Sequence, residues 1–416
     1  MRATLLTLLV AAPLRAQDAV EQAVTDRLAR VQSVAESVEA SQDLLALGSE
    51  ALKPLFRELA RGDGSLARRA TLLAALTPWP RAEFLAFLER GANGDFNDGE
   101  RVAGMNWLAR AGGWDELKLL FELSAAPTAE APLAPQVQAA LAEALHAIAR
   151  RDRGTVRSMC DLFARVGAAP RCAIVQALER LGGDEGLSAL AGLLGGDDPA
   201  MDAVLLLALG DAARVHPNPR DLLVFERVRG YFGHPRADLV VLAVLACASL
   251  HDFGAVPGLV VLLEDSHPEV RDAVSKALER LTGRHDDAGA SAWLAWLDEA
   301  LAWWDERAPA CRTALVSGAP ADAATALAEI AHQRLFLQDV AGLLVLATQR
   351  SEPDIVATAL RALRVLPPAA ARPAFLALAQ GGDPLLAEKA RAVLFSLPSC
   401  SGARRQPSPK LPSLTP

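Results

Sequence analysis

Residues 253–283, FGAVPGLVVLLEDSHPEVRDAVSKALERLTG, predict two helices joined by a tight turn. Apolar residues recur every third or fourth position in both halves, which is the spacing of one helix face. In the second half these are Val270, Val274, Ala277, Leu278 and Leu281. Pro268 fits the first turn of the second helix, where its missing N–H leaves no bond unmade, and Gly283 is a typical stop. Such a pair cannot bury its apolar faces alone, so it requires neighbours of the same kind.

Similar prolines recur along the chain, each after Asp, His or Glu: Pro199, Pro235, Pro268, Pro353 and Pro384. By subtraction they lie 36, 33, 85 and 31 residues apart, where 85 is about two periods plus an insertion. The second, sixth and tenth residues after each proline are apolar and share one helix face. An all-helical period of roughly 30–45 residues is the signature of an α-solenoid.

The segment HPEVRDAVSKAL resembles the second helix of the HEAT-repeat family, above all its short bacterial form with a D/H-P-x-V-R-x-A-A pattern. DPLLAEKARAVL and EPDIVATALRAL match less closely, and the N-terminal half matches only by its period. The resemblance covers most of residues 43–397 and is specific for fold. It implies an all-α, right-handed α-solenoid of about ten antiparallel helix pairs.

Composition favours helices and disfavours nucleic acid as a partner. Hydrophobic residues make up 51% of the 416 residues, but aromatic residues only 5%, which suits closely packed Ala- and Leu-rich helices. The net charge is −8 and no basic block is present, so nucleic acid is a poor candidate partner. The resemblance to the HEAT-repeat family implies a protein or peptide partner.

Residues 1–16, MRATLLTLLVAAPLRA, look like a secretory signal peptide with a positive start, a short apolar stretch and a small residue before the cut. This predicts export to a periplasmic or extracellular compartment, and a buried N-terminal helix is the alternative. No later apolar run reaches ~18 residues, so we expect no transmembrane segment.

The predicted organisation is a lead-in helix at 17–42, repeats at 43–283, a Trp-rich helical insertion at 284–305, repeats at 306–397, and a disordered tail at 398–416.

No motif for catalysis, a cofactor or a metal is found. The sequence lacks H-E-x-x-H, G-x-S-x-G, G-x-G-x-x-G, C-x-x-C and the phosphate-loop pattern. Residues 93–100, NGDFNDGE, superficially resemble a calcium loop, but the spacing favours Asp95 or Asn97 as a helix N-cap. Cys160 and Cys172 fall on the two helices of one predicted pair. They either form a disulfide or, as we prefer, pack as thiols.

Two stretches are candidates for a partner surface. The helices predicted at 200–215 and 236–250 are apolar nearly all round, so part of their surface is either an open apolar face or deep interior. The insertion carries four of the seven tryptophans, which either pack as core, as we prefer, or form an aromatic shelf for a peptide or glycan. The candidate residues are Val240, Val244, Arg271, Lys276, Trp293 and Trp296.

The sequence therefore predicts a non-catalytic interaction or scaffolding module. One alternative is a lyase related to the bilin lyases, whose repeats resemble these, and another is a structural spacer in the cell envelope. A binding module should show an apolar or single-sign surface, and an enzyme a pocket with perturbed titratable groups.

Overall fold

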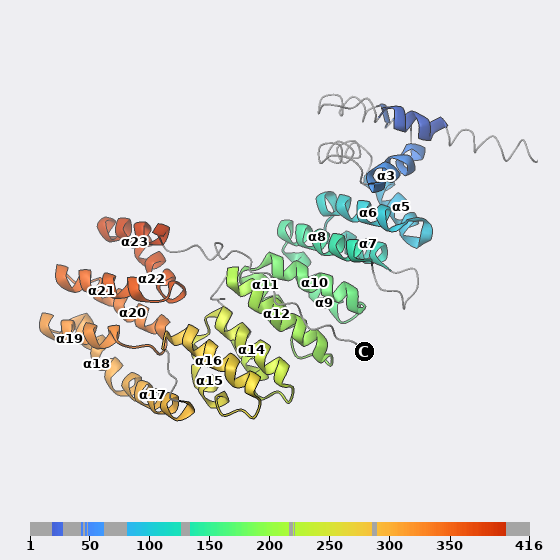
Figure 1. Cartoon of the computed structure of the whole chain (residues 1–416). Helices are drawn as coiled ribbons and strands as arrows, with labels where there is room; N and C mark the ends of the chain where they lie inside the picture. Colours follow the sequence, from blue (N-terminus) through green and yellow to red (C-terminus); the bar gives the residue numbers. More distant parts are fainter. Residues whose placement is uncertain are drawn as a thin grey trace, which may run out of the picture. The chain divides into compact units, whose positions relative to one another are not determined.

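The computed structural model describes residues 19–27, 43–44, 46–47, 49–61, 81–125, 134–215, 219, 221–284 and 289–396. All regular elements within these ranges are helices (Figure 1). The chain forms two compact units, residues 1–181 and 182–416.

The first unit is a stack of helix pairs. Its helices are α3 (Leu52–Arg61), α5 (Arg81–Arg90), α6 (Asp98–Ala111), α7 (Leu117–Ser124), α8 (Pro135–Arg151), α9 (Gly154–Phe163) and α10 (Ala168–Leu181). The second helices α6, α8 and α10 pack side by side in one layer, and α5 packs on α7 in the other. A cluster of aromatic rings, including Phe56, Phe84 and Trp107, fills the core between α3, α5 and α6.

Asn97 is the N-cap of α6, as predicted from the sequence. Its side chain accepts a hydrogen bond from the Glu100 backbone N–H (3.0 Å), and the Glu100 carboxylate accepts one from the Asn97 N–H (2.9 Å). This reciprocal capping box satisfies two of the N–H groups that a helix start leaves unpaired.

The second unit repeats the same layered plan. Its helices are α11 (Gly183–Gly192), α12 (Pro199–Val215), α13 (Leu222–Arg229), α14 (Ala237–Leu250), α15 (Val256–Leu262), α16 (Pro268–Thr282), α17 (Ala290–Ala302), α18 (Ala308–Ser317), α19 (Pro320–Ala331), α20 (Leu337–Ala347), α21 (Pro353–Val365), α22 (Pro368–Gln380) and α23 (Pro384–Ser396). Second helices α12, α14 and α16 pack on one another in series, and α11 packs on α13 in the other layer. The all-α solenoid architecture predicted from the repeat period is therefore confirmed.

The pair predicted at 253–283 is formed by α15 and α16. Val270, Val274 and Leu278 are buried, and Gly283 adopts a left-handed conformation (φ 68°) that ends α16. Glycine reaches this region without steric cost, so it is the usual residue after a helix end.

Arginines tie successive repeats together. Arg151, at the end of α8, donates a hydrogen bond to the carbonyl of Gly112 (2.8 Å), just beyond α6. Arg350 similarly donates to the carbonyls of Leu315 (3.1 Å) and Gly318 (3.1 Å), at the end of α18. These carbonyls have no partner inside their own helices. A positive charge there also interacts favourably with the negative end of the helix dipole. The arginine of one repeat thus caps a helix of the preceding one.

The sequence register fails in α14. Taking Pro235 as the first helical residue places Val241 and Leu245 in the core and Val240 on a free face. In the structure Val240 is 2% exposed and Leu245 is 44% exposed. The reason is that α14 begins at Ala237, whereas α12 and α16 begin at their prolines. The helix α14 does have an exposed face, but Leu245 lies on it and Val240 does not, so the assignment of Val240 was wrong.

The Trp-rich insertion forms α17 and the turn Trp303–Arg307. Trp293 is buried against Trp296, with ring centroids 5.3 Å apart, and the Arg284 guanidinium lies 5.5 Å from both ring centroids. Trp304 contacts Phe336 edge to face (5.8 Å). Trp293 therefore packs as core.

Several predictions concern residues outside the described part of the chain: the signal peptide, most of the lead-in helix, and the tail at 398–416. Cys160 carries a free thiol, so it forms no disulfide with Cys172. Among the described helices, none combines the length and apolar character needed to cross a membrane.

Candidate functional site

Two adjacent second helices each carry exposed apolar side chains. Val204 and Leu207 of α12 are 38% and 40% exposed, and Leu245 of α14 is 44% exposed. The opposite sides of both helices are buried, and α12 and α14 pack closely on each other. We refer to Val204, Leu207 and Leu245 as the α12–α14 apolar face.

The residues predicted for a partner surface do not form one open surface in the structure. Val240 and Val244 are 2% and 0% exposed, so they line no open surface and their assignment to one is wrong. Lys276 is exposed but forms an ion pair with Asp272 (2.7 Å) one turn away. Arg271 donates to the Asp265 (2.6 Å) and Ser266 (3.1 Å) carbonyls, so it closes the turn before α16. Of the two tryptophans, only Trp296 is partly exposed.

A polar pocket of about 380 Å³ lies where the α11–α12 turn meets the end of α13. Gly195, Asp202, Arg227, Tyr231 and His234 are among its lining residues. The Gly195 N–H donates to both the Tyr231 hydroxyl (2.9 Å) and the Asp202 carboxylate (3.1 Å). Burial and the hydrogen bond to Asp202 raise the pKa of Tyr231, so the phenol stays protonated and does not act as a base. These groups hydrogen-bond to one another and so join the α11–α12 turn to the end of α13.

The other perturbed groups nearby are also structural. The Arg229 guanidinium holds the buried Asp252 carboxylate through two hydrogen bonds, one of 2.7 Å, and this joins α13 to the turn after α14. Burial raises the pKa of Cys247, and burial beside Arg280 lowers the pKa of His251 to about 4. A search of the described residues finds no group of three or more His, Cys, Asp or Glu side chains that could hold a metal ion.

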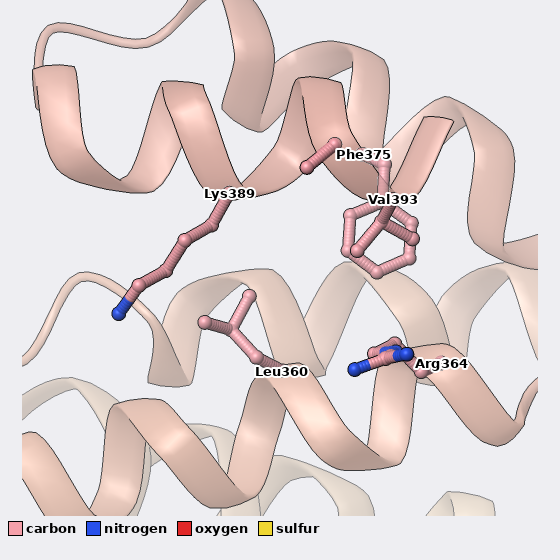
Figure 2. A pocket seen from close by; sticks show the side chains of 6 residues that line it. Leu360, Arg364, Phe375, Lys389 and Val393 are labelled. Atoms are coloured by element: carbon pink, nitrogen blue, oxygen red, sulfur yellow. The ribbon is translucent and has the colours of Figure 1, made fainter. Parts of the chain in front are cut away.

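A second hollow, of about 310 Å³, lies between the last helices (Figure 2). Leu360 and Arg364 of α21 face Lys389, Ala392 and Val393 of α23 across it. Phe375 of α22 is buried and forms the floor. We call this hollow the α21–α23 groove. Sequence reasoning did not find it, because these residues read as ordinary positions of two repeats, and only the packing of α23 separates the helices.

No protein-family model and no curated protein matches the chain. Among solved structures, human deoxyhypusine hydroxylase in complex with glycerol aligns over 65% of this chain and 97% of its own, at 16% identity and a TM-score of 0.28. Kap121p aligns over 90% and 42%, at 12% identity and a TM-score of 0.35. Importin beta aligns over 80% and 46%, at 14% identity and a TM-score of 0.35.

These proteins are HEAT-repeat or HEAT-like structures, the class that the sequence resembles. The chain spans less than half the length of Kap121p and of importin beta.

Proposed function

We propose that this chain is a non-catalytic interaction module that binds a protein or peptide partner on the α12–α14 apolar face. The observation that carries the proposal is the exposure of Val204, Leu207 and Leu245 on two helices in direct contact. Single exposed apolar residues are ordinary, but several of them on two packed helices are typical of an interaction surface.

The lyase alternative has less support. An enzyme needs polar groups that are free to contact a substrate. In the polar pocket, the Asp202 carboxylate, the Tyr231 phenol and the Gly195 N–H are hydrogen-bonded to one another instead. A structural spacer would need no exposed apolar face. The net charge of −8 opposes binding to a polyanion, so apolar contact is the expected driving force.

The proposal also includes family and location. The second-helix pattern of residues 267–278 supports membership of the HEAT-repeat family in its short bacterial form. Residues 1–16 support export to a periplasmic or extracellular compartment. N-terminal sequencing of native material tests the latter: a chain that begins near Gln17 is expected, and a retained Met1 contradicts it.

The binding test uses a phage-displayed peptide library selected on the immobilised chain. Leu245→Asp places a charge in the apolar face and should abolish capture of the enriched peptides, while circular dichroism stays unchanged. Val261→Asp is the control, because Val261 is 66% exposed on α15, in the other helix layer, and should leave capture intact. No enrichment at all would favour the spacer, and equal losses in both variants would show that the captured peptides do not bind the α12–α14 apolar face.

A further inference from the structure

The last pair of helices departs from the packing plan of the second unit. The second helices α12, α14 and α16 contact one another directly in series, and α19 contacts α21. The last second helix, α23, packs mainly on α22, and its contact with α21 is slight. The α21–α23 groove is the space that this leaves open.

The groove combines an apolar floor with two cationic rims. Leu360 and Val393 are partly exposed and supply the apolar surface, and the third apolar lining residue, Phe375, is fully buried. Arg364 projects from α21 and Lys389 from α23, on opposite sides (Figure 2). Among the described residues, no carboxylate forms an ion pair with either of them, although Lys276 and Arg350 elsewhere in the unit are paired.

The charge around the groove is opposite to that of the whole chain. The chain carries −8, yet residues 353–396 contain more cations than acids. The cations are Arg361, Arg364, Arg372, Lys389 and Arg391, and the acids are Asp354, Asp383 and Glu388. A groove with positive charges at its edges and an apolar interior favours a ligand that carries negative charges beside an apolar group.

We propose that the α21–α23 groove binds an extended acidic peptide segment that inserts one large apolar side chain between Arg364 and Lys389. A volume of about 310 Å³ is at the small end of ligand pockets, which suits one side chain rather than a cofactor. In an extended peptide, neighbouring residues lie only ~3.3 Å apart along the chain, so carboxylates on both sides of the inserted residue stay close to the groove. The inference rests on the proposed binding function but uses a different surface.

The test measures fluorescence anisotropy with the full chain and a labelled peptide, Gly-Asp-Glu-Phe-Glu-Asp-Gly. Binding that weakens with added salt is expected, because exposed charges are screened. Replacing the peptide Phe by Ala should weaken binding at least about tenfold, the scale of losing one buried aromatic side chain. A peptide with Lys in place of the acids should not bind.

Two charge reversals separate a specific groove from general attraction. Lys389→Glu should weaken binding roughly five- to tenfold, as expected when an exposed attraction becomes a repulsion. Arg361→Glu on α21 changes the net charge equally, and because Arg361 is exposed and is not among the lining residues of the groove, it should have little effect. Equal effects from the two reversals, or indifference to the peptide Phe, would overturn the proposal.

Two further results keep this inference separate from the proposed function. Leu245→Asp should not change binding of the acidic peptide, so loss of peptides selected on the α12–α14 apolar face and loss of this one are independent outcomes. Tighter binding of a single-stranded oligonucleotide or of anionic lipid vesicles, with the same dependence on Lys389, would replace the peptide by that ligand.

Discussion

The middle of the second unit and its last pair use the same repeat and expose different surfaces. Around α14 the second helices are packed in a continuous layer, and the apolar surface that remains open there is the α12–α14 apolar face. At α23 the layer is interrupted, and the interruption leaves a groove with a buried Phe375 as its floor. The contact between successive second helices, more than the sequence of any one helix, therefore decides whether a repeat presents a face or a groove.

Polar contacts show the same difference. In the middle, two sets of polar contacts join a helix to a neighbouring turn: the Arg229–Asp252 ion pair, and the hydrogen bonds among Gly195, Asp202 and Tyr231. In the groove the charged side chains of Arg364 and Lys389 join nothing in the described part of the chain. We expect the middle to be stabilised by these links and the last pair to open more readily.

The largest effect is expected from Leu278→Ala in α16. Leu278 is fully buried in the packed layer, so its loss should lower the free energy of unfolding by ~2–5 kcal/mol. In a solenoid the loss is carried by neighbouring interfaces, so hydrogen exchange should quicken within about residues 220–310. Leu363→Ala removes a buried leucine of α21 beside the open groove, where relaxation is easier, and should cost less. A larger cost for Leu363→Ala would contradict the comparison.

Lys276→Ala is the local control for Leu278→Ala. Its ion pair with Asp272 is exposed and spans one helical turn, so it contributes only ~0.3–0.5 kcal/mol. Similar losses from Lys276→Ala and Leu278→Ala would show that the assigned face of α16 is wrong.

The middle should also be the acid-sensitive part. Burial, with Arg280 nearby, lowers the pKa of His251 from 6.5 to about 4. The unfolded chain therefore takes up this proton first, and stability falls as the pH drops from 6.5 towards 4, by up to ~1.4 kcal/mol per unit. His251→Asn should flatten this slope in urea titrations at several pH values. Asn tolerates the left-handed backbone of this position (φ 53°). An unchanged slope would assign the effect to other groups.

Arg229→Ala tests the links of the middle directly. Asp252 is buried and would lose its partner, while Arg229 is partly exposed, so we expect a cost of ~2–3 kcal/mol, below the usual range for fully buried pairs. Arg236→Ala breaks a pair with Asp238 that is open to solvent and should cost much less than Arg229→Ala. Chemical denaturation of both variants provides the measurement, and equal costs would remove the distinction between linked and exposed arginines.

The sequence predicts the helix pairs well, because periodic apolar residues, helix-opening prolines and the glycine stop after α16 are all local signals. It fails where position depends on packing. Pro235 precedes α14 by two residues instead of opening it, so Val240 was placed on the surface and Leu245 in the core. The α21–α23 groove depends on how α23 sits on α22, a relation between helices that no single stretch of sequence encodes.

The smallest effect on stability is expected at the groove itself. Arg364 and Lys389 are exposed and form no ion pair within the described residues, so replacing both by Ala should change the free energy of unfolding by less than ~0.5 kcal/mol. The two cations flank one groove, and removing them also removes a mutual repulsion, so a slight gain in stability is consistent with the argument. Urea denaturation of the double variant gives the number, and the acidic peptide gives its functional counterpart. A loss above ~1 kcal/mol would mean that these side chains hold α21 and α23 together, and the reason for assigning them to a ligand would be gone.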